Sequence, residues 1–249
     1  MPEIQWAGRT LSGSDRHGVW TSEVPDGWWD SPDTKGEIVS RTNKDGDYIL
    51  PIYNQARLVT FNGLLRAKSH EKLHQAGIFL TGAMTGRAQV TDHGPTQWAD
   101  AVRAGKIRFT PITDTLASWQ VPLRCPDPRK YGEESKFTIP SLVSVTAYHR
   151  GNAPAYPSFV VAGSMPGGYT LTVGGSQFKV TEPLISGVSH GITFADGRLR
   201  IRGAVVHGGV GTAETPGIAA GTMPTVYLEP AAGSTGTATA FMTLTDTYI

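Results

Sequence analysis

Short runs of alternating apolar and polar residues cover most of the chain, and glycine, proline, aspartate or asparagine closes most of them. In one such run Val59 and Phe61 fall on one face of an extended segment, and Leu58 and Thr60 fall on the other. The pattern predicts strands at 48–53, 57–64, 106–111, 119–123, 144–148, 158–162, 169–173, 177–181, 191–194, 199–201, 225–228 and 237–244. Gly174 and Gly175 predict a two-residue hairpin turn. Many short strands at close spacing favour an all-β sandwich, jelly roll or barrel.

One segment departs from this alternation. Apolar residues recur there at spacings of three and four, which defines one stripe on a helix: Leu73, Ala76, Leu80 and Ala83. Ser69 can cap the N-terminus, and Glu71 is favourable in the first turn. Gly82 and Gly86 are stop signals. The sequence therefore predicts one short helix over about 69–84, packed on the sheet of the first half.

Composition divides the chain near residue 135. Of 22 Lys and Arg residues only six follow this point, as do five of 21 acidic residues, and all six tryptophans precede it. This asymmetry predicts two domains, 1–135 and 136–249. We place the junction at Pro126, Asp127, Pro128 and Tyr131, where proline restricts the backbone, and interpret 132–135 as its polar continuation. The Gly, Ala and Thr-rich stretch 203–221 predicts a long loop.

The formal net charge of +1 gives no electrostatic reason to expect nucleic-acid or anionic-membrane binding. Cys125 is the single cysteine, so neither an internal disulfide nor a cysteine-rich zinc module can form. No apolar run approaches the roughly 20 residues that span a membrane, and residues 1–30 hold no apolar signal segment. We expect a non-secretory protein without membrane insertion.

A zinc-hydrolase motif, H-E-x-x-H, occurs at His70, Glu71 and His74. On one helix face the two imidazoles would bind zinc and the carboxylate would activate water. However, Leu80 stands where the extended motif requires a third ligand, and both histidines flank the apolar stripe, where exposed residues normally lie. We therefore expect an exposed amphipathic helix and no metal or other cofactor, and keep these three residues as metal-site candidates.

A second cluster combines acidic and aromatic side chains: Trp20, Glu23, Asp26, Trp28, Trp29, Asp30 and Asp33. Carboxylates beside aromatic rings are typical of a glycosidase or sugar-binding cleft. The same residues also suit a loop whose tryptophans fill a core or a contact between subunits. We take Trp28, Trp29 and Asp30 as candidates for a subunit interface.

Several motifs in a fixed order carry a family resemblance: GRTLSG at 8–13, GWWDSP at 27–32, DGDY at 45–48, ARLVTFNG at 56–63, the helix, PDPRKYG at 126–132 and GNAPAYP at 151–157. The series resembles the distal tail proteins of long, non-contractile-tailed bacteriophages, particularly those of actinobacterial hosts. The resemblance covers about residues 8–185. The segment 203–249 departs from it, because its Gly, Ala and Thr-rich sequence does not align by motif.

The resemblance implies an N-terminal split β-barrel with one helix, followed by a galectin-like or jelly-roll β-sandwich. It also implies a non-enzymatic virion protein, made in the host cytoplasm, whose six copies close into a ring at the tail tip. The ring would join the tail tube protein to the tail-tip hub. Two alternatives stay open at this stage: a carbohydrate-binding module that attaches to a host cell-wall glycan, and the zinc hydrolase.

Overall fold

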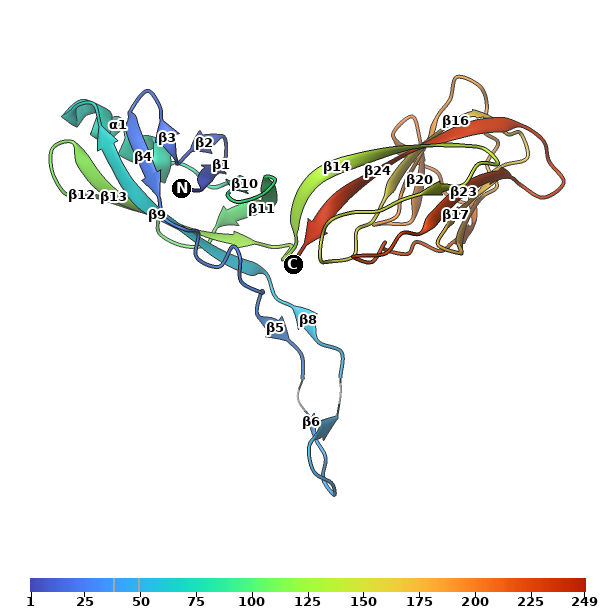
Figure 1. Ribbon diagram of the computed structural model, residues 1–249, viewed down its shortest axis with the longest axis horizontal. Coiled ribbons are helices and arrows are strands. Elements are labelled where there is room, and N and C mark those ends of the chain that lie inside the picture. Colours follow the sequence, from blue (N-terminus) through green and yellow to red (C-terminus); the bar gives the residue numbers. More distant parts are fainter. Residues whose placement is uncertain (38, 49) are drawn as a thin grey trace. The chain divides into compact units, whose positions relative to one another are not determined.

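The computed structural model describes residues 1–37, 39–48 and 50–249 (Figure 1). The chain divides into two compact units, Met1–Tyr131 with Ile249, and Gly132–Tyr248. Each unit has a separate hydrophobic core. The described residues are nearly all in strands and turns, with one short helix, so the all-β prediction is confirmed.

The first unit is built on long antiparallel strands. Its elements are β1 (Glu3–Trp6), β2 (Arg9–Thr10), β3 (Gly13–Ser14), β4 (Gly18–Ser22), β5 (Thr34–Lys35), β6 (Val39–Ser40), β7 (Asp47–Tyr48), β8 (Tyr53–Asn54), β9 (Arg57–Ala67), α1 (His70–Thr81), β10 (Thr85–Thr91), β11 (Gln97–Arg103), β12 (Arg108–Pro111) and β13 (Leu116–Cys125). The main sheet runs β3-β4-β9-β13-β11-β10-β1-β2. Strand β13 pairs with β9 along its whole length and shares its other edge between β12 and β11.

The alternation found around Val59 places β9 correctly. Val59 and Phe61 are buried, whereas Leu58 is exposed. Because the same alternation runs through β13, the two strands together present one apolar face to the core of the first unit. The strand predicted at 57–64 is therefore confirmed, and it continues to Ala67.

Helix α1 covers that core with the predicted stripe, since Leu73, Ala76, Leu80 and Ala83 are all buried. The Ser69 hydroxyl accepts a hydrogen bond from the Lys72 N–H at 3.2 Å, which confirms the predicted N-cap. The predicted C-terminal end is wrong by three residues. The Gly82 N–H bonds to the Ile78 carbonyl and closes the helix, after which the chain enters β10.

The second unit consists of two antiparallel sheets around one core. Its strands are β14 (Lys130–Pro140, shared with the end of the first unit), β15 (Val145–Thr146), β16 (Ser158–Ser164), β17 (Tyr169–Val173), β18 (Ser176–Val180), β19 (His190–Thr193), β20 (Arg198–Ile201), β21 (Ala204–Val205), β22 (Val210–Ala213), β23 (Thr225–Pro230) and β24 (Thr237–Tyr248). One sheet runs β14-β24-β16-β19-β20-β21, and the other runs β15-β23-β17-β18-β22. The predicted hairpin is confirmed, because Gly174 and Gly175, both at positive φ, join β17 to β18.

Three local predictions are wrong. Residues 132–135 are not a continuation of the linker, because they lie within strand β14. The stretch 203–221 is not one loop, since it contains β21 and β22. The strand expected at 48–53 is not continuous: Tyr48 ends β7, Tyr53 begins β8, and Ile49 lies outside the described residues. At 132–135 and 203–221 polar residues or glycines hide the alternation that marks a strand, whereas within 48–53 Pro51 cannot donate to a strand ladder.

Candidate interaction surfaces

An exposed arm, made of the described residues 34–37, 39–48 and 50–54, is the most unusual surface of the first unit. It contains two short ladders, β5 with β8 and β6 with β7 (Figure 1). Every residue of these four strands is exposed. Tyr48, Ile52 and Tyr53 are each more than half exposed, although such residues are usually buried. The arm therefore presents apolar anchors with no core of its own.

Local bonds hold the two ladders in register. The Ser40 hydroxyl donates to Asp47 Oδ1 at 2.8 Å, and the Arg41 guanidinium lies 5.6 Å from the centre of the Tyr48 ring. At the base of the arm, the Gln55 N–H donates to the Asp33 carbonyl at 2.7 Å. A two-stranded ladder without a supporting layer is only marginally stable in water. A surface on another molecule would supply that layer.

The candidate interface residues 28–30 separate into two environments. Trp28 is completely buried and packs against Phe61, with ring centres 6.3 Å apart. It belongs to the core of its own unit and offers nothing to a neighbour. Trp29 is 45% exposed and Asp30 is exposed, so these two remain on the surface.

Two buried cations hold the backbone around Trp28. Arg57 Nη1 donates to the carbonyl oxygens of Gly27, Trp28 and Asp30, at 3.0, 3.3 and 2.5 Å. Lys130 Nζ donates to the same Trp28 carbonyl at 2.8 Å. Burial, and then the neighbouring Arg57 charge, lower the pKa of Lys130 to about 8, although Asp30 opposes the shift. The loop is thus fixed by charge-assisted bonds from residues far away in sequence.

The predicted junction residues form a tight turn between β13 and β14. Tyr131 OH donates to Asp127 Oδ2 at 2.6 Å, and the Pro128 carbonyl accepts from Arg57 Nε at 3.0 Å. Burial, together with the hydrogen bond to Asp127, raises the pKa of Tyr131 to about 12. Pro126 is exposed at the start of this turn. These bonds fix the path by which the chain leaves the first unit.

The H-E-x-x-H residues lie at the N-terminal end of α1. His70 and His74 line a groove of about 300 Å³ whose walls are mostly apolar and include Phe109. Glu71 Oε1 accepts a hydrogen bond from Gln75 Nε2 at 2.9 Å and is exposed. The residues that the structure describes contain no cluster of three metal-ligating side chains. A third zinc ligand is therefore missing from the described surroundings of this pair.

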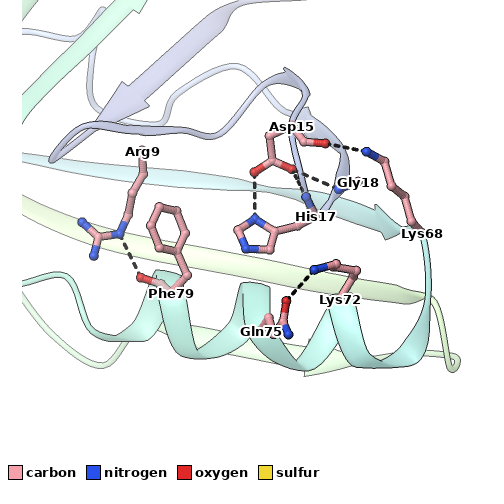
Figure 2. Close-up of polar contacts among 8 residues, drawn as sticks. All are labelled: Arg9, Asp15, His17, Gly18, Lys68, Lys72, Gln75 and Phe79. Carbon is pink, nitrogen blue, oxygen red and sulfur yellow. Dashed lines mark hydrogen bonds and ion pairs between the residues drawn. The ribbon is translucent and has the colours of Figure 1, made fainter.

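His17 is a buried histidine close to α1 that was not predicted as a site residue. Figure 2 shows His17 Nδ1 donating to Asp15 Oδ2 at 2.9 Å, and Asp15 also accepts the N–H groups of His17 and Gly18. Burial alone would raise the pKa of Asp15, but these hydrogen bonds lower it below its usual value. The D-x-H spacing of a turn is the only sequence signal for this contact.

The N-terminal segment is also fixed to α1 through Phe79. The Arg9 Nε donates to the Phe79 carbonyl at 2.8 Å, and the Arg9 guanidinium lies 4.5 Å from the centre of the Phe79 ring (Figure 2). Arg16 approaches the same ring at 5.4 Å. Cation–π contacts and the hydrogen bond thus hold the start of the chain on the helix. This face of α1 therefore serves to hold the N-terminal segment in place.

In the described part of the chain, no helix has the length and apolar character that a membrane crossing requires. No protein-family model matches the chain, and no curated protein matches its sequence.

The two-unit, all-β fold is that of bacteriophage tail-hub proteins. SPP1 Dit (gp 19.1), described as a paradigm of the hub adsorption apparatus in phages that infect Gram-positive bacteria, matches over 100% of both chains with a TM-score of 0.74 and 11% identity. The phage p2 baseplate in its activated conformation, solved with strontium and with calcium, matches in each case with a TM-score of 0.50 and 6% identity, over 97% of this chain and 98% of that chain. At the level of the fold, these findings confirm the resemblance to distal tail proteins.

Proposed function

We propose that this protein is a structural component of a bacteriophage tail tip. Six copies close into a ring that joins the tail tube protein to the tail-tip hub, and the ring itself catalyses no reaction. The observation that carries the proposal is the fold match to SPP1 Dit, because it extends over the full length of both chains and includes both units. In this role the protein is made in the host cytoplasm and ends in the virion.

The exposed arm supports the proposal of a ring, because it offers a surface for contacts between copies. A cyclic ring needs heterologous contacts, in which each copy offers one patch to the copy before it and a different patch to the copy after it. The arm supplies one such patch, since Tyr48, Ile52 and Tyr53 expose apolar surface that association would bury. Burial of each side chain contributes about 1.5–3 kcal/mol. Its mixed charges, Lys35, Glu37, Arg41, Lys44, Asp45 and Asp47, suit pairing at the rim of such a contact.

The test compares the wild-type chain with an arm-shortened variant. In this variant Asn-Gly replaces residues 36–52, so that a two-residue turn joins Lys35 of β5 to Tyr53 of β8. We expect the wild type to form six-fold rings in analytical ultracentrifugation and negative-stain microscopy. The shortened variant is expected to stay monomeric with both units folded in circular dichroism, because none of the described residues among those removed belongs to either core.

Point variants provide a matched control. Tyr48→Ser with Tyr53→Ser should weaken association at least about hundredfold. Val160→Ser with Phe241→Ser removes a similarly exposed apolar pair, on β16 and β24 of the second unit, and should leave the ring intact. A wild type that is monomeric at all concentrations contradicts the ring, whereas rings formed by the shortened variant contradict the role of the arm alone.

A further inference from the structure

The outer face of the second sheet of the second unit brings three polar side chains into one row. Thr170 of β17 pairs with Lys179 of β18 on one side and with Glu229 of β23 on the other. Paired residues point to the same face, and the core face of these strands is taken by Leu171, Phe178 and Leu228. The backbones of Lys179 and Glu229 are therefore about 10 Å apart across Thr170.

This row forms one wall of a surface hollow of about 340 Å³. Thr170, Gln177, Lys179 and Glu229 contribute the polar lining, and Pro230 with Ala231 contributes an apolar rim. The rim is held in place by the Ala231 N–H, which donates to the Gly168 carbonyl at 3.0 Å. The hollow is as large as the smaller pockets that bind small molecules, about 300 Å³ and upward.

Three polar side chains of the hollow have no bonding partner within the described protein. Within the described chain, the side chains of Thr170, Lys179 and Glu229 make no hydrogen bond or ion pair. Thr170 is only 7% exposed as a residue, and the part of it that remains accessible lines the hollow. A hydroxyl, an ammonium group and a carboxylate thus line one surface hollow, where a ligand can replace the water that solvates them.

We propose that this hollow is a binding site for a neutral saccharide. Sugar hydroxyls both donate and accept, so one ring can donate to Glu229, accept from Lys179 and bond to Thr170 at the same time. The apolar C–H face of the ring packs against Pro230 and Ala231. The opposite charges of Lys179 and Glu229 cancel, which removes any preference for an anionic ligand. An apolar ligand would leave all three groups without partners.

The site lies wholly within the second unit, whereas the ring contact proposed above lies on the arm of the first unit, so the two proposals can fail separately. The experiment is ligand-observed NMR followed by isothermal titration on the full chain, with glucose, galactose, mannose and N-acetylglucosamine as probes. A sulfated galactose and triglycine serve as charged probes. At least one neutral sugar is expected to bind saturably. Glu229→Gln, Lys179→Met and Thr170→Val should each raise its Kd about tenfold or more, since each removes a hydrogen bond to the ligand.

Control variants carry the same chemical changes on another sheet. Glu134→Gln and Lys136→Met alter exposed residues of β14 and should leave the Kd unchanged. If Thr170→Val impairs folding, the variants Glu229→Gln and Lys179→Met still test the proposal. Lys179 is exposed and Glu229 is not in the core, so neither change should affect folding. The proposal is overturned if no neutral sugar binds, if only the sulfated sugar or triglycine binds, or if the Glu229 and Lys179 variants bind like the wild type.

Discussion

Lys130 illustrates how one residue connects folding to pH in this protein. Its side chain is 3% exposed, and its ammonium group bonds to the Trp28 carbonyl beside the guanidinium of Arg57. Two buried cations so close to each other are unfavourable unless backbone dipoles offset them. The carbonyls of Gly27, Trp28 and Asp30 provide those dipoles, and the remaining cost appears as the lowered Lys130 pKa.

We predict that the stability contributed at Lys130 rises with pH. Above about pH 8 the folded chain releases the Lys130 proton, whereas the unfolded chain keeps it until about pH 10.5. The unfolded state binds more protons in this window, so the free energy of unfolding increases with pH, by at most about 1.4 kcal/mol per pH unit. Urea unfolding of the wild type and of Lys130→Met, at several pH values between about 7 and 10, measures the difference.

The comparison of these two curves removes the influence of other titrating groups. The raised pKa values of Tyr131 and Tyr248 lower the free energy of unfolding as the pH rises past the pKa of tyrosine in the unfolded chain. This loss is the same in both proteins. Lys136→Met changes an exposed lysine and should run parallel to the wild type. Parallel curves for Lys130→Met as well would contradict the prediction.

At the scale of elements, the packing of β4 on β9 depends on a glycine. A Cβ atom at Gly63 would lie 1.9 Å from the Thr21 carbonyl oxygen and 2.7 Å from Trp119 Cζ2. Neither neighbour can withdraw, because Thr21 lies in the β4–β9 ladder and Trp119 belongs to the core. The close approach of the two backbones therefore requires the absence of a side chain at this position.

We predict that Gly63→Ala destabilises the first unit by about 1–3 kcal/mol, the usual cost of overpacking. Thermal unfolding followed by tryptophan fluorescence measures the loss. Gly94→Ala is the matched control, since a Cβ atom there would have no neighbour within 4 Å. Equal melting temperatures for the two variants would show that β4 moves away from β9 without cost.

The same strands show how far a sequence predicts its elements. Alternation identified β9 because Val59 and Phe61 differ sharply from the exposed Leu58. It missed β10 and β11, whose inward positions include the weakly hydrophobic Ala88 and Ala99. Nor does local pattern decide which of two adjacent tryptophans is buried, since both are equally apolar. The row of Thr170, Lys179 and Glu229 was not predicted either, because strand register, not sequence proximity, brings the three together.

At the scale of the whole molecule, the compositional division of the chain corresponds to two separate cores. The core of the first unit contains Trp6, Trp20, Trp28 and Trp119, and the core of the second unit contains no tryptophan. All six tryptophans precede residue 131. Tryptophan fluorescence therefore reports on the first unit alone, whereas far-UV circular dichroism reports on the strands of both.

These two probes test whether the units unfold independently, as separate cores predict. Phe178→Ala removes a fully buried ring from the second core and Phe61→Ala removes one from the first, each at a cost of about 3–5 kcal/mol. We expect Phe178→Ala to lower the melting temperature of part of the circular-dichroism signal and to leave the fluorescence transition unchanged. Phe61→Ala should shift the fluorescence transition. If both variants shift both signals together, the chain unfolds as one cooperative body.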